Sequence, residues 1–194
     1  MKRIAVLASG NGTNLQAIID AVGNGTIEGA RVTLVVSDRK NAYALTRAQE
    51  HQITTKYLRA ESYISREEYD RELVTYLEEN KIDLVVLAGF MRLITPYFVL
   101  AYQHRIMNIH PALLPAFPGA HGVEDALNYG VKVTGCTVHF VDEGMDTGPI
   151  ILQEAIPVYD QDTTDSLHQR IHVLEYKMYP QAINLWVHGK IKIE

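Results

Sequence analysis

The architecture of this chain follows from the segment Ile4-Ala5-Val6-Leu7-Ala8-Ser9-Gly10-Asn11-Gly12-Thr13-Asn14-Leu15. Its first five residues form a continuous apolar run, which is typical of a strand covered on both faces. A glycine-containing turn follows, and apolar residues then recur at helical spacing from Leu15 to Val22. The segment therefore predicts a buried strand, a tight turn and a helix.

The same alternation continues through the first half of the chain. Ser65 and Glu68 form a capping box that marks the start of a third helix. Further strands are expected at 32–36, 53–58 and 84–88, and a further helix at 42–51. Strands that alternate with helices predict an α/β fold, with an open, doubly wound, mostly parallel sheet of the Rossmann-like kind. Ligands of such sheets bind beyond the carboxyl ends of the strands.

The second half has a different pattern. A short strand at 106–109 leads into a segment that Pro111, Pro115 and Pro118 keep out of helix, as an ordered loop. Strand-like stretches at 131–141 and 150–158 predict an antiparallel extension of the sheet, and a long helix is expected at 163–179, with Pro180 kinking or restarting it. We expect a single domain over 1–194, with a mononucleotide-binding half at 1–104 and a second half at 105–194.

Composition narrows the class of protein. The 194 residues are 47% hydrophobic and 21% charged, as in ordinary globular proteins. The net charge of -5 disfavours a nucleic-acid partner. Cys136 is the single cysteine, so an intramolecular disulfide is impossible and a reducing compartment fits. No apolar stretch approaches the ~20 residues that span a bilayer, so we expect a cytoplasmic protein with no membrane partner.

The glycine turn points to a phosphate. It begins like the dinucleotide fingerprint, but Leu15 stands where the third glycine is needed, so NAD is disfavoured. No Gly-Lys-Ser/Thr follows, so a P-loop is absent too. Backbone N–H groups at a helix start suit a single phosphate monoester, and Thr13 and Asn14 add side-chain donors. A plain strand–helix turn explains the pattern equally well. The turn itself contains no lysine or arginine, which predicts modest, orientation-setting phosphate binding.

A second polar group follows the strand at 106–109. Asn108 and His110 are two residues apart, so on a strand they project to the same side. Asp146 lies in a glycine-containing loop, 142–149. Acyl transfer to an amine develops a negative oxygen, to which Asn108 and His110 can donate N–H groups. Asp146 can orient the histidine and favour its imidazolium form, or take the proton that the amine loses.

Ordinary structural roles remain open for these residues. Asn108 can be a turn former, His110 a satisfied polar side chain and Asp146 a loop carboxylate. A metal site is not expected: His168 and His172 are four apart on the long helix, but the glutamate of H-E-x-x-H is missing.

The chain resembles the folate-dependent glycinamide ribonucleotide formyltransferases over essentially its whole length. The resemblance rests on four segments: Ser9-Gly10-Asn11-Gly12-Thr13-Asn14-Leu15-Gln16-Ala17-Ile18, Leu87-Ala88-Gly89-Phe90-Met91-Arg92, Asn108-Ile109-His110-Pro111-Ala112-Leu113-Leu114-Pro115 and Asp146-Thr147-Gly148-Pro149-Ile150-Ile151. The last two are typical of the wider formyltransferase superfamily, and the first two point to this member.

The resemblance implies the formyltransferase fold, and it implies which residues are catalytic and which bind each ligand. Asn108, His110 and Asp146 are implied to be catalytic. The ribonucleotide is implied to contact Gly12, Thr13, Asn14, Gly89, Pro111 and Glu175. Folate is implied to contact Arg66, Met91, Arg92, Leu93, Ile94, Val141, Asp142, Glu143, Gly144, Met145 and Asp146. The half at 105–194 is implied to be the catalytic and folate half, with further folate contacts from 1–104.

The implied reaction moves the formyl group of 10-formyltetrahydrofolate to the primary amine of glycinamide ribonucleotide, in purine biosynthesis. The reaction is expected to need neither a metal nor ATP. The expected partners are the two small-molecule substrates, and the protein is expected to be a monomer or a homodimer. Three alternatives stay open: 10-formyltetrahydrofolate hydrolase, methionyl-tRNA formyltransferase and a non-catalytic phosphosugar-binding module. The first two normally carry a further domain that is not evident in this chain, and the polar trio argues against the third.

Overall fold

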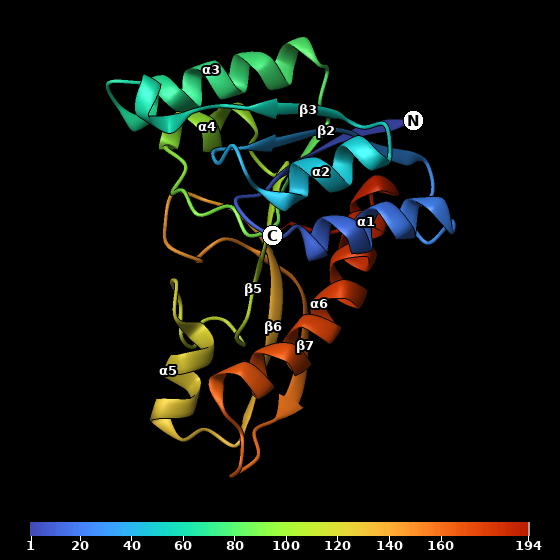
Figure 1. The fold of residues 1–194 in the computed structure, drawn as a ribbon. Helices are drawn as coiled ribbons and strands as arrows, with labels where there is room; N and C mark the ends of the chain where they lie inside the picture. The colour runs from blue at the N-terminus through green and yellow to red at the C-terminus, as the bar shows by residue number, and fades with distance from the viewer. Residues whose placement is uncertain (194) are drawn as a thin grey trace. The chain divides into compact units, whose positions relative to one another are not determined.

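The computed structural model describes residues 1–193, and its strands form a seven-stranded sheet in the order β3-β2-β1-β4-β5-β6-β7 (Figure 1). The strands are β1 (Lys2–Leu7), β2 (Ala30–Ser37), β3 (Thr54–Tyr57), β4 (Leu84–Leu87), β5 (Ile106–His110), β6 (Val133–Phe140) and β7 (Ile150–Pro157). The chain separates into two compact units, Met1–Met107 and the residues from Asn108 onward. β5 therefore carries the boundary between the units.

The first unit is a doubly wound parallel arrangement, as predicted. β1 pairs in parallel with β2 and β4, and β2 pairs in parallel with β3. The unit's helices are α1 (Thr13–Gly23), α2 (Tyr43–Glu50), α3 (Arg66–Glu79) and α4 (Pro96–Ala101), with a 3-10 turn at Ala60–Ser62. α1 and α2 lie on one side of these strands, and α3 and α4 lie on the other (Figure 1). The residues Ile4–Leu7 are fully buried, because helices cover both faces of β1.

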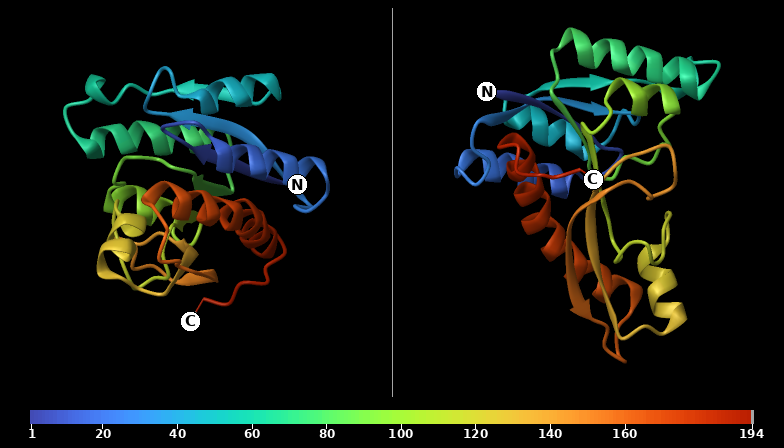
Figure 2. Two further views of the ribbon diagram at one scale, coloured as in Figure 1. Left: turned by 60° about the horizontal axis from the view of Figure 1, so that its bottom comes forward. Right: turned by 180° about the vertical axis from the view of Figure 1, so that it is seen from behind.

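The second unit contains the predicted antiparallel pair. β6 and β7 run antiparallel from Val133 opposite Pro157 to His139 opposite Ile150. Its helices are α5 (Gly122–Tyr129) and α6 (Thr164–Val187), and α6 lies along β6 and β7 (Figure 2). Gly135 allows the two strands to pair closely, because a Cβ there would come within 2.0 Å of the Glu154 carbonyl oxygen. Cys136 is fully buried under α6, with its thiol 3.2 Å from the sulfur of Met178.

Three helical features differ from the sequence predictions, and each involves proline. α4 was not predicted, although it begins at Pro96, a residue that is tolerated in the first turn because its missing N–H would have no acceptor there. α5 was not predicted either; it begins at Gly122, soon after the proline-containing loop. α6 continues past the buried Pro180 to Val187. Among the described residues, no helix is both long and apolar enough to cross a membrane.

Candidate active site

The glycine turn of the first unit leads into α1 through a left-handed residue. Gly12 is the N-cap of α1, with φ of 76°, and no side chain caps the helix. The first intrahelical hydrogen bond joins the Gln16 N–H to the Gly12 carbonyl at 2.9 Å. The amides at the start of α1 therefore have no acceptor one turn back, which is the arrangement that binds anions at helix starts.

α2 packs directly on this turn and fixes its backbone. A Cβ on Gly12 would lie 2.8 Å from the Cα of Ala44, so the glycine is required by packing as well as by its φ. The Ala44 N–H donates to the Gly10 carbonyl at 3.1 Å. The Arg47 guanidinium donates to the Asn11 carbonyl at 2.9 Å and to Asn11 Oδ1 at 2.8 Å. Arg47 of α2 thus brings a positive charge to a turn whose own residues include no lysine or arginine. The prediction made from the residues of the turn alone did not include this charge.

The chain after β4 is tied to the end of β1. The Ser9 N–H donates to the carbonyl of Gly89, which has φ of 71°. The Ser9 hydroxyl accepts from the Met91 N–H at 2.9 Å and donates to Asp38 Oδ1 at 2.6 Å. Ser9 therefore fixes the position of the Gly89–Met91 segment. In that segment Gly89 is a predicted ribonucleotide contact and Met91 is a predicted folate contact.

The predicted folate residues of the first unit form an exposed apolar and cationic segment. The side chains of Met91 and Leu93 are 69% and 56% exposed, although both are large and apolar. The Arg92 guanidinium stands 4.3 Å over the ring centre of the buried Tyr69. Ile94 is half-buried, and Arg66 is exposed at the start of α3.

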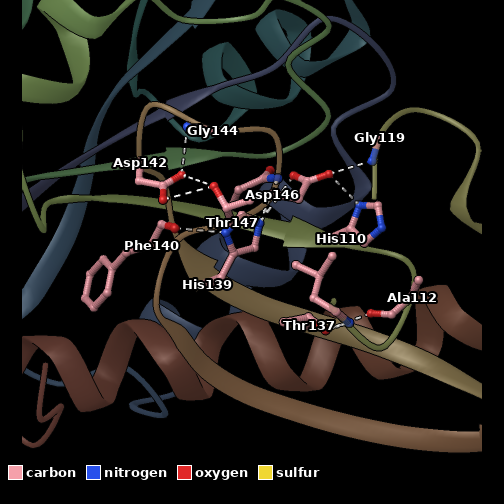
Figure 3. Close-up of polar contacts among 12 residues, drawn as sticks. His110, Ala112, Gly119, Thr137, His139, Phe140, Asp142, Gly144, Asp146 and Thr147 are labelled. Atoms are coloured by element: carbon pink, nitrogen blue, oxygen red, sulfur yellow. Dashed lines mark hydrogen bonds and ion pairs between the residues drawn. The ribbon is translucent and has the colours of Figure 1, made fainter. Parts of the chain in front are cut away.

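The three predicted catalytic residues lie in the second unit, Asn108 and His110 at the end of β5 and Asp146 in the loop between β6 and β7. Figure 3 shows His110 and Asp146 facing each other. Asp146 Oδ2 is 3.4 Å from His110 Nδ1 and accepts from the Gly119 N–H at 2.8 Å. Asp146 has φ of 54°, a left-handed conformation that Asp tolerates better than most residues. His110 is buried, and the Asp146 side chain is largely so.

The second ring nitrogen of His110 also has a partner. Nε2 is 2.7 Å from the carbonyl oxygen of Phe117. Because a carbonyl oxygen can only accept, Nε2 carries a proton and donates it. The sequence predicts that this ring donates to a reacting oxygen; in the structure its Nε2 donates to the Phe117 carbonyl.

His139 is a further member of this group of side chains, and it was not among the residues predicted from the sequence. Its Nδ1 is 2.9 Å from the Phe140 carbonyl, and its Nε2 is 3.3 Å from Asn108 Nδ2 and 3.6 Å from Asp146 Oδ1 (Figure 3). Burial lowers the pKa of His139 below its usual value, against smaller opposing effects that include the Asp146 charge. The neutral ring must carry its proton on Nδ1, facing the carbonyl. Nε2 is then an acceptor that fixes the Asn108 amide with its nitrogen toward the ring.

A signal for His139 was present in the sequence. Thr137 and His139 alternate with apolar residues along β6, so they share one face of that strand. Polar side chains buried on a strand need polar partners. The sequence alone does not show that Asn108 faces that side.

The Asp142–Thr147 segment is folded by its own side chains. Asp142 Oδ1 accepts from the Gly144 N–H at 3.1 Å and from the Thr147 hydroxyl at 2.8 Å. A Cβ on Gly144 would lie 2.0 Å from the Thr147 hydroxyl oxygen, so a larger residue there would displace the hydroxyl that donates to Asp142. Glu143 and Met145 are exposed, and Val141 is half-buried.

Glu175 and Pro111 complete the set of predicted residues. Glu175 is buried on α6, and its Oε2 lies 2.8 Å from His172 Nδ1. That hydrogen bond raises the pKa of His172 above its usual value, although burial opposes it. Pro111 directly follows His110 and is half-buried. Within residues 1–193, no group of three or more His, Cys, Asp or Glu side chains has the arrangement of a metal site.

Comparisons with known proteins identify one family for this chain. The family model described as formyl transferase matches residues 2–183. The phosphoribosylglycinamide formyltransferase of Escherichia coli (strain K12) is 45% identical over 190 residues, which cover 98% of this chain and 89% of that protein. The enzyme of the same name from Bacillus subtilis (strain 168) is 44% identical over 183 residues, covering 94% and 93%.

Longer relatives and solved structures extend the match. The trifunctional purine biosynthetic protein adenosine-3 of Drosophila melanogaster is 47% identical over 190 residues, but the match spans only 14% of that protein. The crystal structure of glycinamide ribonucleotide transformylase 1 from Symbiobacterium toebii superposes with a TM-score of 0.98 at 49% identity, covering 100% of this chain and 91% of that one. On the strength of both the family model and these near full-length relatives, the chain belongs to the formyl transferase family.

Proposed function

We propose that this chain transfers the formyl group of 10-formyltetrahydrofolate to the primary amine of glycinamide ribonucleotide, releasing formylglycinamide ribonucleotide and tetrahydrofolate. The observation that carries the proposal is the grouping of Asn108 and Asp146 around the buried His110 and His139. Relatives named phosphoribosylglycinamide formyltransferase match almost the whole chain and do not favour the hydrolase or a non-catalytic module.

Asn108 serves as one donor to the oxygen that becomes negative. Its amide nitrogen has two protons, and one is directed to the Nε2 acceptor of His139 at 3.3 Å. The other is left for the formyl oxygen. An amide fixed before the reaction stabilises the developing charge without a reorganisation cost.

His110 serves as the second donor. Its Nε2 proton is held by the Phe117 carbonyl in the structure, and we propose that the formyl oxygen replaces that carbonyl as the acceptor. Catalytic hydrogen bonds commonly form only when the substrate is bound. Asp146, at 3.4 Å from Nδ1, orients the ring from its other side.

The protons of the transfer balance within the site. The amine nitrogen bonds to the formyl carbon and loses a proton, while the bond from that carbon to the donor nitrogen breaks and that nitrogen gains a proton. Asp146 is assigned to take the amine proton, directly or through water, and that proton is passed on to the donor nitrogen. Neither a metal ion nor ATP takes part in this scheme.

We assign the ribonucleotide phosphate to Gly12, Thr13 and Asn14. The start of α1 supports this, as does Arg47, because a formal positive charge at the turn favours an anion. Gly89, Pro111 and Glu175 are assigned to the rest of the ribonucleotide. A buried carboxylate such as Glu175 suits sugar hydroxyl or amine donors.

The residues assigned to the folate fit such a molecule in each unit. In the first unit, the exposed Met91 and Leu93, with Ile94, offer apolar contact to an aromatic ring system. Arg66 and Arg92 are assigned to its glutamate carboxylates, which guanidinium groups bind well. In the second unit, the folded loop of Val141, Asp142, Glu143, Gly144, Met145 and Asp146 offers backbone groups on a fixed path. We further propose a cytoplasmic monomer or homodimer that binds neither nucleic acid nor membranes.

A single assay tests the function. The protein is incubated with 10-formyltetrahydrofolate, in EDTA and without ATP, and tetrahydrofolate formation is followed with and without glycinamide ribonucleotide. We expect full turnover that depends on the amine. Equal turnover without the amine would select the hydrolase, and a strict requirement for ATP and magnesium would overturn the assignment.

A further inference from the structure

The loop between β5 and α5, residues 111–119, is held in place by hydrogen bonds from side chains outside the loop. Pro111, Pro115 and Pro118 have no backbone N–H, so the loop has few donors with which to fold on itself. A short turn joins the Ala116 N–H to the Leu113 carbonyl at 3.0 Å. Its remaining backbone groups need partners elsewhere, because buried polar groups that lack partners are costly.

Thr137 on β6 is the main partner, and its hydroxyl is fully used. It donates to the Ala112 carbonyl at 2.7 Å (Figure 3), and it accepts from the Leu114 N–H at 3.0 Å and from Gln153 Nε2 at 3.0 Å. A hydroxyl has one proton and two lone pairs, so all of its hydrogen-bonding capacity is committed. Thr137 is completely buried, which makes the loss of any of these bonds expensive.

Gln153 on β7 completes the anchor. It stands directly opposite Thr137 in the antiparallel pairing of β6 and β7. Its amide nitrogen has two protons: one goes to the Thr137 hydroxyl and the other to the Leu114 carbonyl at 2.8 Å. The Thr137–Gln153 pair therefore holds both backbone groups of Leu114.

The far end of the same loop contacts two of the catalytic residues. The Phe117 carbonyl accepts from His110 Nε2 at 2.7 Å, and the Gly119 N–H donates to Asp146 Oδ2 at 2.8 Å. The anchored loop thus supplies one backbone group to the histidine and one to the carboxylate. A displacement of its anchored end would be passed to both.

We propose that Thr137 and Gln153 are positioning residues for formyl transfer, which act through the loop at 111–119. They set Asp146 through the Gly119 N–H, and they set His110 through the Phe117 carbonyl until the formyl oxygen takes the place of that carbonyl. The inference rests on the proposed function for its readout. It goes beyond that function because the hydrogen bonds described above join Thr137 and Gln153 to the loop and to each other, and not to Asn108, His110 or Asp146.

The matched test compares two threonines of the same strand. Thr137→Val removes the hydroxyl but keeps the shape. Thr134→Val makes the same change at a buried threonine whose hydroxyl has no hydrogen-bond partner among residues 1–193. Misplacement of catalytic groups by about 1 Å can cost ~100-fold, so we expect kcat of Thr137→Val to fall about 10- to 100-fold, with both KM values little changed. Thr134→Val should keep the wild-type kcat, and Thr137→Ser, which retains a hydroxyl, should restore most of it.

If Thr137→Val folds poorly, a second variant, Gln153→Met, tests the same inference by amide hydrogen exchange and by kcat. Gln153→Met removes two donors and leaves the Thr137 hydroxyl with its two loop partners. It should speed amide exchange at Leu114 and Gly119, lower kcat, and leave exchange in the β6–β7 pairing unchanged. Equal kcat for Thr137→Val and Thr134→Val would overturn the inference, as would unchanged exchange in Gln153→Met. Absence of amine-dependent transfer in the wild type would instead overturn the proposed function.

Discussion

At the scale of single residues, the site depends on which nitrogen carries a proton. The Phe117 and Phe140 carbonyls face His110 Nε2 and His139 Nδ1, and each carbonyl fixes a proton on the nitrogen that it faces. His139 is thereby an acceptor for Asn108, whereas His110 has a donor at Nε2, which the proposed function directs to the reacting oxygen. Two histidines beside one carboxylate therefore have opposite roles.

Replacing Asp146 by asparagine tests the charge at a constant shape. Asparagine tolerates the left-handed backbone found at Asp146, and it retains an oxygen for the Gly119 N–H. We expect a large fall in kcat and an altered kcat–pH profile, with the ribonucleotide KM nearly unchanged. For comparison, His110→Ala should lose about 100- to 1000-fold in kcat, as loss of an oxyanion donor does. An Asp146→Asn enzyme with wild-type kcat and pH profile would remove Asp146 from the mechanism.

Replacing His139 by leucine tests the orientation of Asn108. The variant has no acceptor for the Asn108 amide, which becomes free to rotate, so kcat should fall by up to about 100-fold, the lower end of the cost of losing one oxyanion donor. The double variant with Asn108→Ala should then lose little more than Asn108→Ala alone, since the two residues act as a unit. Additive losses measured for the two changes would show that His139 acts independently of Asn108.

At the scale of elements, the glycine turn owes its shape to the helix packed on it. Gly12 has a left-handed φ and lies against Ala44 of α2, whereas a Cβ on Gly10 would meet no atom within 4 Å. The two glycines are two residues apart in the same turn. They therefore form a matched pair for substitution by alanine.

Gly12→Ala should be clearly destabilising and Gly10→Ala should not. The left-handed conformation alone costs an alanine about 1–2 kcal/mol, and the contact with Ala44 adds to this. We expect a lower urea midpoint and a raised ribonucleotide KM for Gly12→Ala, with the folate KM little changed. Similar urea midpoints for the two variants would contradict the packing argument, and a rise in the folate KM would show that the turn serves the other ligand.

Sequence patterns predicted the elements whose signals are local. The apolar run of β1, the cap of α3 at Ser65 and the antiparallel β6–β7 pair all appear in the structure. α4 was missed because Pro96 was not recognised as a helix-starting residue. Arg47 and His139 were missed for a different reason: each reaches the turn or the trio from a distant element, and a contact between distant elements leaves no periodic signal in the sequence.

At the scale of the whole molecule, buried histidines link stability to pH. Burial lowers the pKa of His139 and of His168 below the usual histidine value of 6.5. The unfolded chain therefore binds protons at these positions that the folded protein does not. Their contribution to stability is present above about pH 6.5 and is lost as the pH falls below that value. His172 has a raised pKa, so its contribution has the opposite sign and is lost as the pH rises through that pKa.

The expected result is a fall in the free energy of unfolding as the pH is lowered below about 6.5, and this fall depends partly on His139. Urea unfolding of the wild type and of His139→Leu at several pH values checks this. The variant should show a shallower loss of stability on acidification, because one group that must be protonated on unfolding is gone. A parallel pH dependence for the two proteins would mean that His139 is not held neutral in the fold.

The fate of the formyl carbon tests the central claim most directly. The wild-type protein is given 10-formyltetrahydrofolate labelled with ¹³C in the formyl group, together with glycinamide ribonucleotide, and the products are followed by NMR. We predict that the label appears as a formamide on the ribonucleotide, in step with the tetrahydrofolate formed. Label released as free formate, at a rate that is the same with and without the ribonucleotide, would contradict the account.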